Sequence, residues 1–145
     1  MAIKFPSVEF FQELANRMQG NAAEFEKLGF CDTVMAVKVD GGDPHLYGLT
    51  FSCFDCTDVR ELGGADELEL DFTLVAPLAL WREMFESIQK SGIPEPAYTL
   101  NSLSHVGDRM AVVYDDPEGH DKFYRFMATI QAFVNQASDL DIEWA

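Results

Sequence analysis

Cys53 and Cys56 stand in Cys53-Phe54-Asp55-Cys56, a spacing shared with many redox-active and metal-binding cysteine pairs. A redox pair needs its first cysteine at the N-terminus of a helix, where the helix dipole lowers the pKa of the thiol. The residues around this pair predict strands, and positions three apart in a strand point to opposite faces of a sheet. A structural zinc site needs further ligands, and only Cys31 and three scattered histidines remain. We therefore interpret the pair as a chance occurrence.

Glu67, Glu69 and Asp71 alternate with large apolar residues over positions 67–75. In a continuous strand the three carboxylates would share one face, with neighbours roughly 6.5–7 Å apart, a distance found between the acid and base of inverting glycosidases. A solvated sheet face has the same pattern, and no aromatic side chain that could stack on a sugar shares the face with these acids. We interpret the three carboxylates as solvent-facing.

The three histidines are also candidates for chemistry, but they lie far apart in the sequence. His45 falls in a predicted turn, and His120 lies in the first turn of a predicted helix among carboxylates, which favour helix N-termini without any metal. His105 precedes Gly107-Asp108 in a predicted loop, where a His–Asp pair could transfer protons. The chain contains no nucleophile elbow, Walker loop, dinucleotide fingerprint or HExxH motif. We predict no catalytic residue, no metal site and no cofactor.

Composition narrows the classes of function. The 145 residues include 10 Lys and Arg against 25 Asp and Glu, a formal charge of −15, yet 48% are hydrophobic. Such a chain is too apolar to be disordered, and it repels the phosphates of nucleic acids and anionic lipid surfaces. We see no signal peptide and no run of about 18 apolar residues, which a membrane helix needs. With three cysteines, we expect a cytoplasmic protein that binds no nucleic acid and does not insert stably into membranes. A homodimer is compatible with these features.

Helices are predicted near both ends of the chain and once between them. Apolar residues recur at helical spacing from Ser7 to Gly20, and a short helix follows over 21–28. Pro77 begins a third helix, which Gly92 ends. A long last helix begins at Asp116-Pro117-Glu118 and continues to about residue 137, and residues 138–145 are expected to fray.

Strands are predicted in the middle of the chain. The candidates are Thr33–Val39, Leu46–Phe54 with Cys53 on its apolar face, Thr57–Leu62, Glu67–Val75 and, as a last strand, Tyr98–Leu103. Residues 110–114 fit a strand or a helix. Strands joined by short links predict an α+β fold, a single domain over residues 1–145, with a mostly antiparallel sheet covered by helices on one face.

The predicted helices and strands offer many Phe, Met and Leu side chains, and six Met with 12 Phe would give a deformable interior. The order of parts over residues 7–135 resembles the sterol carrier protein 2 domain family. The similarity is greatest in the step from Leu70-Asp71-Phe72-Thr73-Leu74 to Trp81-Arg82-Glu83-Met84-Phe85. Gly107-Asp108 is similar to the Gly-Asp that commonly follows the last strand of the family.

The resemblance implies a sheet of about five strands with an apolar tunnel between sheet and helices. Domains of this family bind fatty acyl chains, sterols or other lipids and carry them through water without covalent chemistry. The resemblance implies that the tunnel is lined by Phe72, Leu74, Trp81, Met84 and Phe85 on one side and by Met110, Val113, Phe126, Met127 and Ile130 on the other. The long last helix would be its lid.

Two other hypotheses remain open. The first is an interaction protein with a filled core that docks a basic partner through an exposed aromatic patch and acidic faces. The second is a small isomerase-like enzyme in which Asp71 or Asp108 lies in an apolar pocket with a raised pKa. The predicted alternation points Asp71 outward, which disfavours the enzyme. The sequence thus favours a non-enzymatic carrier of a lipid or another apolar small molecule.

Overall fold

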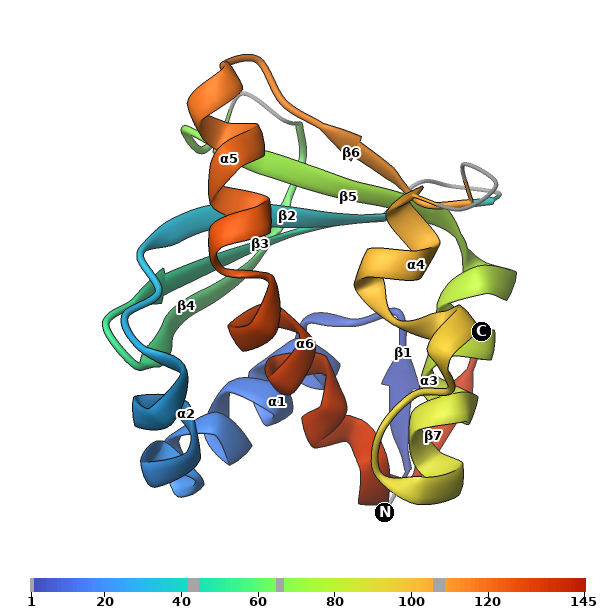
Figure 1. Ribbon diagram of the computed structural model, residues 1–145. Helices are drawn as coiled ribbons and strands as arrows, with labels where there is room; N and C mark the ends of the chain where they lie inside the picture. The colour runs from blue at the N-terminus through green and yellow to red at the C-terminus, as the bar shows by residue number, and fades with distance from the viewer. Residues whose placement is uncertain (1, 42–44, 65–66, 106–108) are drawn as a thin grey trace.

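The computed structural model describes residues 2–41, 45–64, 67–105 and 109–145, and helices cover one face of a five-stranded sheet (Figure 1). The elements are β1 (Ile3–Phe5), α1 (Val8–Gly20), α2 (Ala22–Leu28), β2 (Thr33–Asp40), β3 (His45–Ser52), β4 (Asp55–Leu62), β5 (Phe72–Pro77), α3 (Leu78–Ser91), η1 (Pro96–Tyr98), α4 (Leu100–His105), β6 (Ala111–Val113), α5 (Pro117–Arg125), α6 (Met127–Asn135), η2 (Gln136–Asp139) and β7 (Ile142–Trp144). Gly107-Asp108 lies outside the described residues. Within the described part, no helix is long and apolar enough to cross a membrane.

The sheet has the strand order β4-β3-β2-β5-β6 and is mostly antiparallel, as predicted. The predicted strands over Thr33–Val39 and Leu46–Phe54 correspond to β2 and β3, which are antiparallel neighbours with Val37 paired with Tyr47. β3 and β4 are also antiparallel, as are β5 and β6, whereas β2 and β5 are parallel, with Met35 beside Phe72. The short strands β1 and β7 pair in parallel in a separate two-stranded sheet. This topology confirms the predicted α+β class.

Alternation along the strands separates two faces of the five-stranded sheet. The inner face carries the large buried side chains of β2, β3 and β5: Met35, Val37, Tyr47, Leu49, Phe72 and Leu74. On the outer face, Ala36 lies opposite Gly48. A Cβ on Gly48 would lie 2.8 Å from Leu68 Cδ1, so the Leu68 side chain, from the residues that precede β5, covers Gly48 closely on this face.

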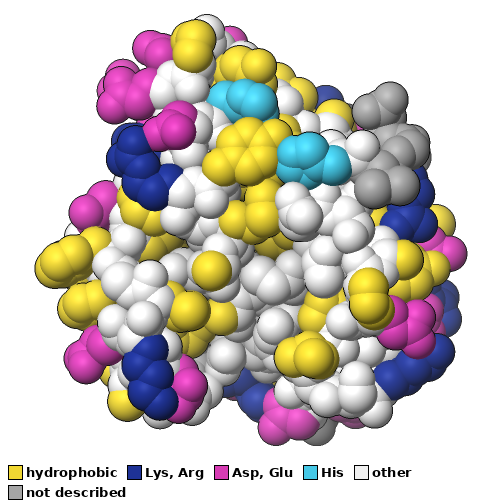
Figure 2. All heavy atoms as spheres, in the orientation of Figure 1, with side chains coloured by type: hydrophobic (Ala, Val, Ile, Leu, Met, Phe, Trp, Pro, Cys, Tyr) yellow, Lys and Arg dark blue, Asp and Glu magenta, His cyan; other side chains and the backbone are white. Residues whose placement is uncertain are grey.

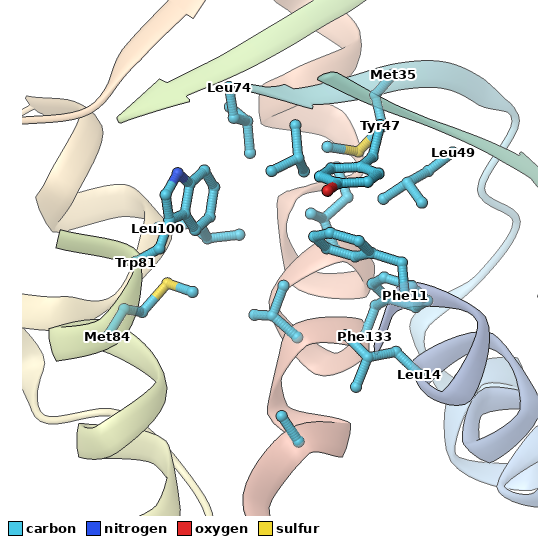
Figure 3. Packing of buried hydrophobic residues seen from close by; sticks show 14 of the residues in the cluster. Phe11, Leu14, Met35, Tyr47, Leu49, Leu74, Trp81, Met84, Leu100 and Phe133 are labelled. Carbon is cyan, nitrogen blue, oxygen red and sulfur yellow. The ribbon is translucent and has the colours of Figure 1, made fainter. Parts of the chain in front are cut away.

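The helices and the inner face of the five-stranded sheet enclose one apolar core. In Figure 3, Trp81 and Met84 of α3, Phe11 and Leu14 of α1 and Phe133 of α6 lie in the same interior as the strand side chains. α1 begins as predicted, because Ser7 Oγ accepts a hydrogen bond from Phe10 N at 3.0 Å. α3 also ends as predicted, at Gly92, whose φ of 89° is left-handed.

The predicted strand over Glu67–Val75 is wrong in its first half, since β5 begins only at Phe72. Asp71 explains the late start. Its backbone N donates to Val34 O at 2.7 Å, and its carboxylate accepts from Val34 N at 2.9 Å. The side chain therefore occupies a position that a strand carbonyl would otherwise take. The preceding residues cross the sheet, so Glu67, Glu69 and Asp71 do not form a row on one strand.

The predicted strand over Tyr98–Leu103 is also wrong, since these residues form the end of η1 and most of α4. Thr99 begins the helix, because its Oγ1 accepts a hydrogen bond from Ser102 N at 3.1 Å. Leu100 and Leu103 are fully buried and lie three residues apart, which is a helical spacing. The last strand of the five-stranded sheet is instead β6, within the segment 110–114 that had fitted either type of element.

The predicted long last helix is two helices, α5 and α6, separated by Phe126 with φ −106° and ψ 10°. The break lets α5 lie over β5 while α6 packs among the other helices (Figure 1). Residues 138–145, expected to fray, contain the end of η2 and all of β7. Trp144 packs on Phe5, with ring centroids 5.5 Å apart, so side-chain burial holds the end of the chain in place.

Candidate functional site

The residues predicted to line a tunnel lie, with one exception, in a single apolar layer between the sheet and the helices. Seven of them are fully or almost fully buried: Phe72, Leu74, Trp81, Met84, Phe85, Met110 and Ile130. Phe126 and Met127 are partly buried and pack against this layer. Val113 differs, because 52% of its surface is exposed at the edge strand β6. In this structure the buried side chains pack as one cluster.

Trp81 is held in a defined orientation at the start of α3. Its indole N–H points at two backbone carbonyls, with 3.1 Å to Ala76 O and 3.3 Å to Lys38 O. The ring also stacks on Phe85 with centroids 6.5 Å apart. These contacts join α3 to the ends of β2 and β5, and they hold the Trp81 side chain in one orientation at the edge of the apolar layer.

α5 covers the opposite side of the layer and rests on β5 through two buried residues, Gly119 and Phe123. The Phe123 ring meets Phe72 edge to face, with centroids 5.4 Å apart. At Gly119 the helix touches backbone directly, because a Cβ there would lie 2.8 Å from the carbonyl carbon of Asp71 and closer still to its oxygen. Only glycine permits this approach.

An ion pair joins α5 to the start of β5. Lys122 Nζ lies 3.3 Å from both carboxylate oxygens of Asp71, and each side chain is 25% exposed. The same carboxylate accepts hydrogen bonds from Thr33 Oγ1 at 2.8 Å and from Val34 N. Asp71 thus lacks the apolar surroundings that the isomerase hypothesis requires. Sequence reasoning placed Asp71 in solvent because nothing local indicates Lys122 as its partner.

A surface pocket of about 480 Å³ opens beside this contact. Residues 68–73 form one wall, and the opposite wall is made by 113–116 with Glu118, Gly119 and Lys122. Of the predicted lining residues, it contains Phe72 and Val113. The pocket therefore adjoins the apolar layer at the place where α5 meets β5.

The cysteines lie away from this region. Cys53, predicted on the apolar face of a strand, is instead exposed after the end of β3 with φ 57°, whereas Cys56 is buried. Burial raises the pKa of the Cys56 thiol to about 12, and burial together with the nearby Asp32 charge raises that of Cys31 to about 12. Protonated thiols are poor nucleophiles. Among the described residues, no group of three or more His, Cys, Asp or Glu could hold a metal ion.

Two histidines lie on an exposed cluster that sequence reasoning missed. His120 stacks on Tyr114 with centroids 4.3 Å apart, and it meets Tyr124 in a T-shaped arrangement with centroids 4.9 Å apart. His105 Nδ1 lies 2.8 Å from Asn101 O and so donates to it, which leaves Nε2 to accept from Tyr124 OH at 2.8 Å. Figure 2 shows histidine and hydrophobic side chains gathered on this face. The predicted partner of His105, Asp108, lies outside the described residues.

Comparison with known proteins supports the fold through structure. No protein-family model and no curated protein matches the sequence. A crystal structure of sterol carrier protein 2 matches with a TM-score of 0.62 and 16% identity, over 91% of this chain and 95% of that one. TT1886, a conserved hypothetical protein of Thermus thermophilus described as possibly a sterol carrier protein, matches with a TM-score of 0.68 and 18% identity, over 93% and 88%.

A third structure, the ubiquinone synthesis protein UbiJ-SCP2, matches with a TM-score of 0.51 and 17% identity, over 89% of this chain and 90% of that one. All three likenesses extend over most of both chains. They show that this chain has the fold of sterol carrier protein 2, which confirms the resemblance seen in the sequence.

Proposed function

We propose that this chain, which has the fold of sterol carrier protein 2, is a non-enzymatic carrier that holds one hydrophobic molecule, such as a fatty acyl chain or another lipid, between its sheet and its helices. The observation that carries the proposal is the residue composition of the apolar layer. This layer lies between the inner face of the sheet and the helices α3 and α5, and it consists of Phe, Trp, Met, Leu and Ile side chains. A lipid chain in this layer would meet hydrocarbon on every side.

The driving force would be burial. Each methylene moved out of water contributes about 0.8 kcal/mol, so a chain of about sixteen carbons gains enough to offset the ordering that binding requires. The buried side chains must move apart to admit it. Met35, Met84 and Met110 suit this role, because an unbranched thioether side chain adapts its shape at little cost.

The ligand would enter the apolar layer under α5. This helix buries only Gly119 and Phe123, and the break at Phe126 separates it from α6. The pocket of about 480 Å³ already opens beside the α5–β5 contact and contains Phe72. A small outward movement of α5 would connect this pocket with the apolar layer, while α6 and the rest of the core keep their packing.

The first experiment asks whether the protein binds lipid at all. Native mass spectrometry and solvent extraction of the purified protein should detect a co-purifying lipid, and a fluorescent fatty acid should bind and be displaced by palmitate. Trp81 supplies an internal reporter, because a ligand in the layer would change its emission. Absence of both co-purified lipid and fluorescent fatty acid binding would refute the carrier function.

The second experiment locates the site. Met127 is partly buried against the layer, whereas its neighbour Ala128 is exposed on the same helix. Met127→Trp should occupy ligand space and weaken fatty acid binding at least about tenfold, because bulk added at a packed position excludes other groups. Ala128→Trp should bind as the wild type does. Equal binding by both variants would place the ligand elsewhere.

A further inference from the structure

Asp71, which immediately precedes β5, contacts both β2 and α5. Its carboxylate accepts from Thr33 Oγ1 and Val34 N of β2, and it contacts the Lys122 ammonium of α5. Its own carbonyl group lies against Gly119. Among the ion pairs of the described residues, Asp71–Lys122 is the least exposed, at 25% for each side chain. Water and salt therefore weaken it less than the exposed pairs.

Among the described residues, the other polar contacts of α5 do not reach the sheet. Asp116 caps the N-terminus of the helix, and Arg125 pairs with Asp121 within the same helix. The Tyr124–His105 hydrogen bond joins α5 to α4 at the exposed surface. Among the described contacts, the Lys122 ammonium thus provides the charged link between α5 and the start of β5.

We propose that the Asp71–Lys122 pair is a latch that holds α5 against β5 and sets the rate at which ligand enters and leaves the apolar layer. This inference rests on the proposed carrier function. Asp71 acts as a positioning residue: it controls the helix and does not touch the ligand. Opening breaks the Asp71–Lys122 ion pair, the packing of Gly119 and Phe123 and the exposed Tyr124–His105 hydrogen bond.

The hydrogen bonds of Asp71 make the latch reversible. When Lys122 departs, Thr33 Oγ1 and Val34 N still hold the carboxylate in its orientation, so its half of the latch stays in place. Lys122 lies in the last turn of α5, close to the break at Phe126. A helix that pivots at this break would bring the ammonium back to the same carboxylate on closing.

The test compares three kinds of variant. The first removes one charge of the Asp71–Lys122 pair, the second keeps that charge on a different side chain, and the third removes a charge elsewhere on α5. Lys122→Met removes the ammonium and keeps a long helix-forming side chain, and Lys122→Arg keeps the charge. Asp71→Asn removes the carboxylate charge and retains one oxygen that can accept from β2. Arg125→Met is the matched control, because it removes a cation from the same helical turn whose partner, Asp121, is also in α5.

Amide hydrogen exchange of the ligand-free protein reports helix opening directly. We expect Lys122→Met and Asp71→Asn to speed exchange in residues 117–125 roughly three- to tenfold, with exchange in α1 and α3 less affected and the thermal midpoint lowered by only a few degrees. Lys122→Arg and Arg125→Met should match the wild type. Dissociation of a bound fluorescent fatty acid, measured by stopped flow, should accelerate in the same two variants by a similar factor.

Ionic strength separates a charged latch from a purely steric contact. Added NaCl should speed α5 exchange in the wild type and have no such effect in Lys122→Met. Unchanged α5 exchange in Lys122→Met, or equal acceleration in Lys122→Arg, would overturn the latch. If no variant, including the wild type, binds fatty acid, the carrier function fails, while hydrogen exchange still decides whether the pair holds α5 closed.

Discussion

Glycine at position 119 determines how closely α5 approaches the sheet. The helix lies against the backbone of Asp71, and this approach leaves no room for a Cβ. Phe123 and Lys122 can reach Phe72 and the Asp71 carboxylate only because the helix lies this close. A residue without a side chain thus positions the two side chains that fasten the helix.

Gly119→Ala should therefore destabilise the protein by about 2 kcal/mol or more, since the clash is with backbone and cannot be relieved by a rotamer change. Urea unfolding followed by circular dichroism measures the change. Gly20→Ala is the control: it lies in α1 with open space around the added Cβ, and it should be neutral or slightly stabilising. Equal effects of the two substitutions would contradict the close approach.

The buried thiols of Cys31 and Cys56 predict sensitivity to alkaline pH. Burial raises both pKa values from 9.0 to about 12, so the folded state binds these protons more tightly than the unfolded chain does. Tyr47, whose pKa burial raises from 10.0 to about 12, acts in the same direction. The stabilisation is complete below pH 9 and is lost as the pH rises from about 9 to about 12.

The free energy of unfolding should consequently fall as the pH rises from about 9 to about 12, measured by urea titration at each pH. Cys31→Ala with Cys56→Ala should flatten this dependence, leaving the part due to Tyr47. The exposed Cys53 offers the matched control, because Cys53→Ala should leave the slope unchanged. A slope that survives removal of the buried thiols and matches the wild type would refute their role.

At the scale of elements, the short pair β1–β7 holds the end of the chain on the core. Trp144 lies against Phe5 and Phe85, and Arg82 contacts its ring face. Backbone pairing over three residues contributes little alone, so aromatic packing must supply much of the stability of this contact.

Trp144→Ala should lower the free energy of unfolding by about 2 kcal/mol and speed amide exchange in β1, because it removes the aromatic contacts that hold β7. Glu143→Ala, at an exposed position of the same strand, should have little effect. If Trp144→Ala unfolds like the wild type, the packing of β7 contributes nothing to stability.

The largest errors of sequence reasoning concern elements whose local signals compete with distant contacts. Glu67–Asp71 alternate as a strand should, yet they cross the sheet because Leu68 covers Gly48 and the Asp71 carboxylate binds β2. The helical stripe from 117 to 137 continues without a breaker, yet the helix divides at Phe126 because its halves pack on different partners. Hydrophobic periodicity indicates which side chains are apolar, but it does not predict the surface against which they pack.

For the whole molecule, the net charge of −15 should make stability depend on salt. Like charges on the surface repel one another in the compact state, and dissolved ions screen this repulsion. Raising NaCl from about 0.02 to about 0.5 M should therefore raise the thermal midpoint by several degrees. KCl at equal ionic strength is the control for ion-specific effects. A midpoint that falls with both salts would show that attractive ion pairs outweigh the repulsion.

The sequence alone determined the α+β class, the start of α1, the end of α3 and the approximate positions of β2 and β3, because capping residues, turn residues and hydrophobic periodicity act over a few positions. The tertiary structure alone decided where Asp71 and Lys122 meet, why position 119 is glycine and where the last helix breaks. These features join residues up to 51 positions apart. Their partners are brought together by burial of the whole core, which no local pattern encodes.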